Sequence, residues 1–439
     1  MRGVAVRHFI AAKNLVYATW FVFCIFVIAQ VISLQPGLIR GHVRLHESRF
    51  EPAIVWSAEQ RPPISEPTYL LRHDRDPDEA FPKIEVREPQ VIWRSPPINH
   101  GIHTAAKSSA AVDESGIYVG GDSGWIWAFE HDGQVRWRVF AGASQRGIHG
   151  TAALDQDSVY IGAYNGRLYR IAKASGEVIF IAALADAIGT SPWIQDQKIY
   201  VGAETGSTLL GRLYVLEQDR GEILARSAWI DEQTHSSPMY FPNSRMALMG
   251  ANDGHLYAYG AGGGSPQWYA DVGGAAKGPI SRALWRGLEL ALLGTWNHRL
   301  YAFRADTGEL LWSSALAGRS QGAPILERGT HDQRLVIVNT HLPNEVIAVR
   351  LSDGRQVWRR NTEARINHGN LAPVTWGVNS WGFLLPCRET RICLAEGRSG
   401  KILWSVDLGR GFSSTPTVHN GRIHVVLEAG ELVVLGVRK

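Results

Sequence analysis

Cysteine is nearly absent from this chain of 439 residues, which contains only Cys24, Cys387 and Cys393. The sequence has no CxxCH motif for covalent haem attachment, no paired CxxC motifs for zinc and no HExxH motif. We therefore expect no metal site built on these motifs. Disulfide-dense folds are excluded as well, because they need many more cysteines.

A large excess of charge of one sign is also missing. Lys and Arg number 45 against 41 Asp and Glu, and three of the basic residues precede residue 35, which leaves 42 against 41 in the remainder. A near-neutral body is not the electrostatic footprint of a nucleic-acid-binding protein, so we expect no nucleic-acid partner. Methionine is rare, whereas 46 glycines and 16 tryptophans favour many short strands and tight turns.

One long hydrophobic run is present, NLVYATWFVFCIFVIAQVISL at 14–34, without a charge over its 21 residues. About 20 apolar residues cross a bilayer as a helix, and the basic residues of 1–13 favour a cytoplasmic N-terminus. We predict a transmembrane anchor at 14–34, and hence a single-pass inner-membrane protein with its body in the periplasm. A cleaved signal peptide is the alternative. Eight of the 20 prolines fall in 35–89, which predicts an extended periplasmic stalk.

The rest of the chain is built from a repeat. A glycine stands four residues before the last residue of a motif that occurs seven times in phase, and that residue is aromatic in all but one copy. The copies are HDGQVRW ending at Trp137, ASGEVIF at Phe180, DRGEILA at Ala225, GGGSPQW at Trp268, DTGELLW at Trp312, SDGRQVW at Trp358 and RSGKILW at Trp404. A hairpin pattern precedes each copy, and a further strand with small residues or proline precedes each hairpin.

Eight such first strands occur, at a spacing of roughly 43 residues, against seven outer strands. The segment QVIWRS, with Trp93, supplies the missing outer strand of the last unit. We therefore predict an all-β fold at 90–439: a closed eight-bladed β-propeller of four-stranded antiparallel blades, the last blade completed by the N-terminal strand. The recurring aromatic residues are expected to dock each blade on its neighbour; they are Trp93, Trp137, Phe180, Trp268, Trp312, Trp358 and Trp404.

Segments such as YAFRADTGELLW, WAFEHDGQVRW and CLAEGRSGKILW resemble the repeat of the pyrroloquinoline quinone (PQQ) type propellers. That superfamily includes quinoprotein dehydrogenases, which oxidise alcohols or sugars with PQQ and calcium. It also includes the non-enzymatic periplasmic propeller of the outer-membrane β-barrel assembly machine, a docking scaffold. The resemblance implies the fold, and it leaves both kinds of function open.

The residues that the dehydrogenases need are scarce here. Those enzymes use an adjacent cysteine pair and acidic calcium ligands, whereas Cys387 and Cys393 are six residues apart. Near the first strands of the repeats the carboxylates are Asp186 and the pair at 231–232. We therefore expect no cofactor and no metal, with PQQ and calcium kept for the enzyme alternative.

Polar residues precede several of these first strands and are candidates for a ligand site at one mouth of the propeller. A small polar ligand, an anion or a metal would be bound there by Lys107, His149, His235, Gln321 and Asn370. The alternative is that these positions are polar only because water wets them.

Two further features are specific to single blades. The third hairpin is five residues longer than the standard one and carries Leu209 and Leu210, which are candidates for contact with a protein partner. Cys387 and Cys393 flank the seventh hairpin. A three-residue turn centred on Thr390 would allow a disulfide between them, and a two-residue turn would leave two separate thiols.

From the sequence we expect a non-catalytic scaffold for protein interaction or assembly, with protein partners in the cell envelope. A PQQ-dependent dehydrogenase and a sensor of a small ligand or metal are the alternatives. Acidic ligands converging on the propeller axis would distinguish the enzyme from the scaffold.

Overall fold

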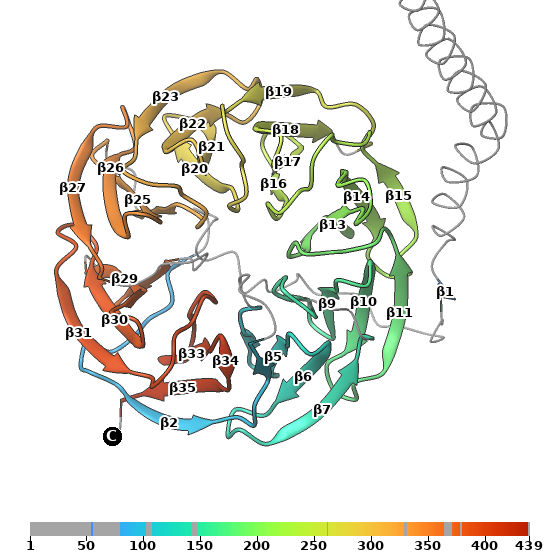
Figure 1. Ribbon diagram of the computed structural model, residues 1–439, viewed down its shortest axis with the longest axis horizontal. Coiled ribbons are helices and arrows are strands. Elements are labelled where there is room, and N and C mark those ends of the chain that lie inside the picture. Colours follow the sequence, from blue (N-terminus) through green and yellow to red (C-terminus); the bar gives the residue numbers. More distant parts are fainter. Residues whose placement is uncertain are drawn as a thin grey trace, which may run out of the picture. The chain divides into compact units, whose positions relative to one another are not determined.

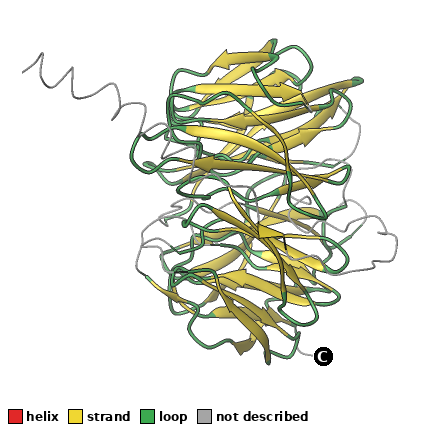
Figure 2. Ribbon diagram, turned by 90° about the vertical axis from the view of Figure 1, so that its right-hand side faces the viewer, coloured by secondary structure: helices red, strands yellow, loops and turns green. Residues whose placement is uncertain are grey.

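Eight antiparallel sheets of four or five strands form a ring of blades in the computed structural model (Figure 1). The structure describes residues 54–55, 80–101, 108–142, 147–260, 262–328, 332–363, 371–377 and 380–437. Figure 2 shows the ring from the side, with strands and loops but no helix among the described residues. The predicted eight-bladed, four-stranded architecture is confirmed.

Blades 1 to 4 follow one another along the chain, each running from its inner to its outer strand. Their strands are, for blade 1, β4 (Ala111–Asp113), β5 (Gly116–Gly120), β6 (Trp125–Phe129) and β7 (Val135–Phe140); for blade 2, β8 (Ala153–Leu154), β9 (Ser158–Gly162), β10 (Arg167–Ala172) and β11 (Val178–Ala183); for blade 3, β12 (Trp193–Gln195), β13 (Lys198–Glu204), β14 (Gly211–Glu217) and β15 (Ile223–Arg226); and for blade 4, β16 (Met239–Phe241), β17 (Met246–Gly250), β18 (His255–Gly260) and β19 (Trp268–Asp271).

Blades 5 to 8 continue the ring. Their strands are, for blade 5, β20 (Ser281–Trp285), β21 (Leu288–Gly294), β22 (Arg299–Arg304) and β23 (Leu310–Ala315); for blade 6, β24 (Ile325–Leu326), β25 (Leu335–Thr340), β26 (Glu345–Arg350) and β27 (Gln356–Asn361); for blade 7, β28 (Ala372–Thr375), β29 (Trp381–Cys387), β30 (Arg391–Glu396) and β31 (Ile402–Asp407); and for blade 8, β32 (Thr417–His419), β33 (Arg422–Val426), β35 (Leu432–Gly436) and β2 (Gln90–Arg94).

The outer strand of blade 8 comes from the other end of the propeller sequence. Strand β2 pairs antiparallel with β35, with Gln90 opposite Gly436 and Trp93 opposite Val434. A short extra ladder joins β3 (Asn99–His100) to β34 (Ala429–Gly430) in the same region. Both ends of the sequence from 90 to 436 therefore meet in one blade.

Burial explains the sequence pattern of the strands. The second strand of blade 1, β5, is buried along its whole length, and β9 of blade 2 has the same pattern, because neighbouring blades cover both faces of these strands. Such strands are continuously apolar rather than alternating. The outer strand β7 instead consists mostly of exposed and half-buried residues around the buried Trp137, since one of its faces meets solvent.

The recurring tryptophan and glycine form one interlock between successive blades. Trp312 donates its indole Nε1–H to the carbonyl of Leu351 in blade 6 at 2.7 Å, and Trp268 donates to Ala305 in blade 5 at 3.1 Å. Gly308 has a positive φ of 74°, and a Cβ at this position would overlap the ring of Trp268. In six of the seven motifs the glycine thus makes room for the aromatic ring of the preceding blade; the exception is Gly264, whose preceding blade has Ala225 at the docking position.

The other docking residues follow the same geometry with one exception. Trp93 donates to His131 at 3.2 Å, and Trp137 donates to Lys173 at 2.8 Å. Phe180, Trp358 and Trp404 are buried as well, at 0%, 8% and 6% exposure, but neither indole Nε1 has a partner among the described residues. For Trp404 of blade 7 the reason is plain. The acceptor in the other pairs lies in the turn between the third and outer strands of the next blade, and blade 8 has no such turn because its outer strand β2 comes from the other end of the sequence. The next blade after Trp358 is blade 7, which does have this turn. Within the described part of the chain, Trp358 is therefore the one docking tryptophan whose indole lacks its hydrogen bond although the turn is present.

This difference predicts unequal effects of two matched substitutions. Trp137→Phe removes a buried indole hydrogen bond, whereas Trp358→Phe removes none. We expect Trp137→Phe to lower the free energy of unfolding by about 1 kcal/mol more than Trp358→Phe does. Urea denaturation of both variants measures the difference, and equal losses would show that the Trp137 hydrogen bond contributes nothing.

Part of the segment expected to be a stalk, 35–89, contacts the propeller instead. Strand β1 (Ile54–Val55) pairs with β11, which makes blade 2 five-stranded. Phe81 is 7% exposed, and the backbone N–H of Ile84 donates to the carbonyl of Thr375 in blade 7 at 2.9 Å. Apolar side chains within the Pro-rich segment thus find cover on a blade, which its composition does not reveal.

The predicted localisation needs correction. It was inferred from an apolar run long enough to span a bilayer, yet across the part of the chain that the structure describes, no helix has the length and apolar character to cross a membrane. The predictions at 1–13 and 14–34 lie outside the described residues. The single-pass inner-membrane assignment therefore has no support in the structure.

Cys387 and Cys393 are joined by a disulfide, with a Cα–Cα distance of 5.9 Å. Cys387 lies opposite Arg391 and Cys393 opposite Leu385, so the turn has three residues but is centred one residue before Thr390. The two cysteines are therefore diagonal rather than directly opposed. Because residues two apart on a strand share a face, the sulfur atoms still meet.

Candidate functional site

One face of the ring gathers the loops that enter the inner strands and the hairpins between second and third strands; we name it the axial face. Backbone hydrogen bonds join the two sets of loops within a blade, as from Trp296 to Ala275 at 3.0 Å in blade 5. Others join neighbouring blades, as from Ser320 to Thr295 at 3.0 Å. These bonds hold loops from distant parts of the sequence in fixed positions.

The predicted ligand residues do not form a single cluster among the described residues. The ring of His149 contacts that of Tyr164 in a tilted arrangement with centroids 4.5 Å apart, and Gln321 accepts a hydrogen bond from Trp296 at 3.2 Å. His235 contacts a carboxylate described below. Lys107 and Asn370 lie outside the described residues. The structure thus places three of the five predicted residues on the axial face, each in its own set of contacts.

A buried carboxylate that sequence reasoning missed lies on this face. Glu204 is 1% exposed, and its Oε1 lies 3.3 Å from Nδ1 of His235. Burial lowers the pKa of the Lys277 ammonium group; the carboxylate of Glu204 opposes this shift and the guanidinium of Arg319 adds to it. Glu204 stands two residues after Gly202 in the hairpin of blade 3, just as Trp296 stands two residues after Gly294 in blade 5. This shared position in the repeat could have indicated from the sequence that Glu204 lies on the axial face.

Aromatic rings covered by cations are the second feature of the axial face. Lys277 Nζ lies 4.0 Å and Arg319 Cζ 4.7 Å from the ring centroid of Trp296. Arg212 Cζ lies 4.0 Å from the ring centroid of Trp229. Such cation–π pairs hold large, amphipathic side chains in place without burying them fully.

The long hairpin of blade 3 projects an exposed leucine. Leu209 is 49% exposed and has a φ of 56°, while Leu210 is half-buried and donates its backbone N–H to Thr205 Oγ1 at 2.9 Å. Arg212 and Trp229 lie next to this hairpin, because Gly211 pairs with Ile230. We name Leu209, Arg212 and Trp229 the blade 3 patch.

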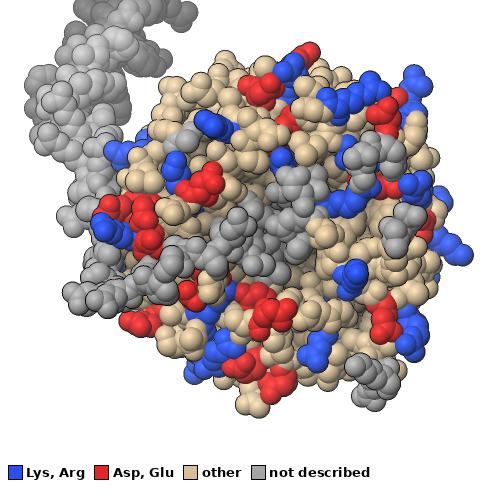
Figure 3. All heavy atoms as spheres, turned by 180° about the vertical axis from the view of Figure 1, so that it is seen from behind, with Lys and Arg blue, Asp and Glu red and all other residues tan. Residues whose placement is uncertain are grey.

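Charge is mixed over the molecule. Figure 3 shows Lys and Arg side chains interspersed with Asp and Glu on one face, without a large field of one sign. Several of these charges are paired on the surface, such as Arg286 with Asp332 at 2.7 Å. This distribution is typical of surfaces that do not attract a polyanion.

The residues present do not fit a calcium-bound quinone. In the described parts of the chain, no three His, Cys, Asp or Glu side chains gather as ligands for a metal ion. The cysteines that could have formed a pair near a cofactor are bonded to each other between blades 6 and 7. The carboxylate of Glu204 has a histidine beside it, with Nδ1 of His235 3.3 Å from its Oε1. The axial face therefore offers aromatic, cationic and leucine side chains rather than a set of metal ligands.

These features define the class: an eight-bladed propeller whose blades interlock through a tryptophan and a glycine of the PQQ type. A family model described as outer membrane protein assembly factor BamB matches residues 122–252, 252–364 and 343–438. The chain belongs to this family of PQQ-like propellers.

Solved structures with the same fold include both branches of the superfamily. BamB from Moraxella catarrhalis is 19% identical over 80% of this chain and 98% of its own, with a TM-score of 0.60. Quinohemoprotein alcohol dehydrogenase ADHIIG from Pseudomonas putida HK5 is 12% identical over 80% and 77%, with a TM-score of 0.64. A europium-containing methanol dehydrogenase is 11% identical over 85% and 98%, with a TM-score of 0.65. None of the curated proteins compared matches significantly. At these identities the structural likeness establishes the fold alone.

Proposed function

We propose that this protein is a non-catalytic scaffold that docks a protein partner on its axial face, in the assembly of outer-membrane proteins. The family description supports the process, because the matched model is that of an assembly factor. The observation that carries the proposal is the blade 3 patch, where an exposed leucine lies beside a tryptophan covered by an arginine. A scaffold needs no catalytic group, and docking requires only complementary surface.

The residue types on the axial face are those that dominate protein interfaces. Trp and Arg are enriched among the residues that contribute most of the binding energy, and Trp229 and Trp296 both carry arginine on their rings. A second leucine, Leu342, is 67% exposed on the corresponding hairpin of blade 6. Exposed leucines on two hairpins of one face fit a partner that spans several blades.

The first test is crosslinking from a photoreactive residue placed at position 209 in cells that make the full chain. We expect an adduct with a protein of the outer-membrane assembly pathway, identified by mass spectrometry. Position 224 is the matched control, since Leu224 is 51% exposed but lies on the outer strand β15. Adducts of equal yield at both positions, or none at 209, would overturn the proposed docking surface.

Substitution of Leu209 in the blade 3 patch should lower the yield of crosslinking. Leu209→Asp is expected to lower the yield of adduct from a photoreactive residue at position 229 at least tenfold, while Leu224→Asp leaves it unchanged. Aspartate tolerates the left-handed backbone at position 209, so we expect Leu209→Asp to change stability by no more than about 0.5 kcal/mol. A loss of folding, measured by circular dichroism, would instead assign Leu209 a structural role.

A separate measurement tests the dehydrogenase alternative. Titration of the folded protein with PQQ and calcium by calorimetry is expected to show no stoichiometric binding. Stoichiometric binding together with oxidation of an alcohol or sugar would overturn the scaffold proposal.

A further inference from the structure

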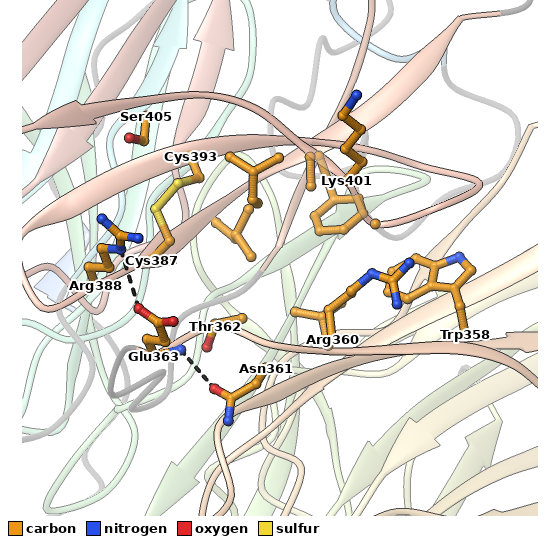
Figure 4. A pocket seen from close by; sticks show the side chains of 16 residues that line it. Trp358, Arg360, Asn361, Thr362, Glu363, Cys387, Arg388, Cys393, Lys401 and Ser405 are labelled. Carbon is orange, nitrogen blue, oxygen red and sulfur yellow. Dashed lines mark hydrogen bonds and ion pairs between the residues drawn. A yellow bond between two sulfur atoms is a disulfide. The ribbon is translucent and has the colours of Figure 1, made fainter.

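A cavity of about 380 Å³ lies between blades 6 and 7 (Figure 4). Its apolar wall consists of side chains from both blades, among them Trp358, Phe383, Leu385 and the disulfide of Cys387 and Cys393. Polar groups at its border are Arg360, Thr362, Glu363, Arg388, Lys401 and Ser405. Its volume is within the range of about 300–1,000 Å³ that is usual for small-molecule sites.

Comparison with the other blade interfaces explains why this space is open. In three of them a tyrosine of the third strand crosses to the preceding blade and donates its hydroxyl to a backbone carbonyl. These bonds join Tyr169 to Ala141 at 2.6 Å, Tyr214 to Leu184 at 2.7 Å and Tyr301 to Val272 at 3.0 Å. In each case the acceptor lies four residues after the docking aromatic residue. The phenol ring thus fills the interface at this level.

Blade 7 has a cysteine where those blades have tyrosine. Cys393 lies opposite Leu385, as Tyr301 lies opposite Leu293 in blade 5. The residue four positions after Trp358 is Thr362, and both Cys393 and Thr362 line the cavity. The cavity therefore occupies the place that a tyrosine ring fills elsewhere.

Blade 6 also lacks this tyrosine, but apolar side chains fill the space there. Ile347 holds the third-strand position, opposite Val338. It belongs to one buried cluster with Leu316, which stands four residues after Trp312. The polar Thr362 replaces that leucine at the interface of blades 6 and 7, so the apolar filling seen at the interface of blades 5 and 6 is missing here.

Trp358 is oriented differently from the other docking tryptophans. A Cβ at Gly400 would meet Cζ3 and Cη2 at the outer edge of the Trp358 ring, whereas a Cβ at Gly308 would meet Cε3 and Cδ2 of Trp268. The indole Nε1 of Trp358 is buried without a partner among the described residues, although the side chain is only 8% exposed. A buried donor without an acceptor is destabilising, so this wall can gain from a ligand with an acceptor.

The charge at the border of the cavity favours an anion. Glu363 is paired with Arg388 at 3.3 Å, on the side of the disulfide. Arg360 and Lys401 stand away from the disulfide in Figure 4, and no carboxylate of the described residues pairs with either. Arg360 donates its Nη1–H to the carbonyl of Arg359 at 3.2 Å, so two cations without a carboxylate partner among the described residues line a cavity with an apolar wall.

We propose that this cavity binds a small aromatic acid. Its ring takes the place of the tyrosine that blade 7 lacks, between the disulfide, Phe383 and Trp358. Its carboxylate lies toward Arg360 and Lys401. The site is independent of the docking face and does not rest on the proposed function.

The test uses the full chain and three probes of similar size in ligand-observed NMR titrations. 4-Hydroxyphenylacetate carries the anion, p-cresol is neutral, and tyramine carries a cation. We expect saturable binding of 4-hydroxyphenylacetate, and binding of p-cresol and tyramine at least tenfold weaker. Absence of saturable binding of the anion, or equal binding of all three, would overturn the proposal.

Two paired variants locate the site. Cys387→Ala with Cys393→Tyr restores the tyrosine and fills the cavity, so affinity for 4-hydroxyphenylacetate should fall at least tenfold. Cys387→Ala with Cys393→Ala removes the disulfide without filling the space and should retain affinity within about threefold. Equal affinity of the tyrosine and alanine variants would place the binding elsewhere.

A surface variant keeps the test valid if the tyrosine variant does not fold. Arg360→Gln with Lys401→Gln leaves the core unchanged and should weaken binding of the anion about tenfold without affecting p-cresol. Arg355→Gln is the control, because Arg355 is exposed on blade 6 and pairs with Asp353 at 3.6 Å, outside the cavity. A loss of the same size in Arg355→Gln would indicate non-specific attraction by surface charge and would contradict the site.

Discussion

Replacing Glu289 by alanine is expected to lower the free energy of unfolding by about 3–5 kcal/mol. Glu289 is paired with Arg282 at 2.5 Å, and the two side chains are only 3% and 2% exposed. Its carboxylate also accepts hydrogen bonds from the backbone N–H and hydroxyl of Ser244 in the neighbouring blade 4, at 2.9 and 2.7 Å. The substitution therefore leaves a buried guanidinium without its carboxylate and cuts a link between blades.

Guanidinium chloride denaturation at pH 7 measures this loss. Glu309→Ala is the matched control: Glu309 pairs with Arg304 at 3.2 Å but is 59% exposed, and its loss should leave the denaturation midpoint unchanged. The double variant Arg282→Met with Glu289→Leu should recover most of the stability, because it removes both buried charges together. If Glu289→Ala and Glu309→Ala behaved alike, burial of the pair would have no energetic consequence.

Stability is also expected to fall steeply in mild acid because of His424. This side chain is 1% exposed on strand β33, and its Nδ1 lies 3.2 Å from the carbonyl of Thr417. Burial lowers the pKa of the imidazole to about 3; the bond to Thr417 opposes this shift, and the nearby His419, His131 and Arg422 add to it. The folded protein therefore keeps His424 neutral at a pH where the unfolded chain protonates it.

The sign follows from proton uptake on unfolding. Below the unfolded pKa of about 6.5 the unfolded state binds a proton that the folded state does not, so the free energy of unfolding decreases by about 1.4 kcal/mol per pH unit from this residue. At pH 4.5 the loss is about 3 kcal/mol, and the dependence ends near pH 3, where the folded state also protonates.

Urea denaturation between pH 8 and pH 4 tests this expectation. His424→Gln retains a donor for the carbonyl of Thr417 but does not titrate. Below pH 6.5 the slope of its free energy of unfolding against pH should therefore be smaller by the contribution of about one proton. Above pH 7 the difference between the variant and the original protein should be constant. The same slope in both proteins below pH 6.5 would show that His424 is protonated in the folded state.

The fold could be predicted because most blades repeat the same physical solution. A glycine that makes room for a ring, and a ring four residues later that docks on the next blade, leave a period that is visible in RADTGELLW and its copies. The disulfide was left open because the sequence does not decide between a two-residue and a three-residue turn, and the observed three-residue turn is centred one residue before Thr390. A shift of one residue in that centre separates diagonal from opposed partners.

The sites were harder to predict, for two different reasons. Glu204 was missed because its burial depends on loops that converge only in the folded ring, although its place in the hairpin register was available. The cavity between blades 6 and 7 is marked by what is missing: Cys393 stands at a position of Trp127, Tyr169, Tyr214, Tyr257 and Tyr301 in other blades. A search for reactive residues overlooks such a position, while an alignment of the blades reveals it.

The interlock of tryptophan and glycine has a consequence for how such chains can grow. The unit with RADTGELLW carries both the ring that docks forward, Trp312, and the glycine that receives the ring behind it, Gly308. A duplicated unit therefore brings both residues of the contact between blades, and gene duplication can lengthen the chain without a new kind of contact. Departures such as Cys393 can then accumulate in single copies while the common joint is kept.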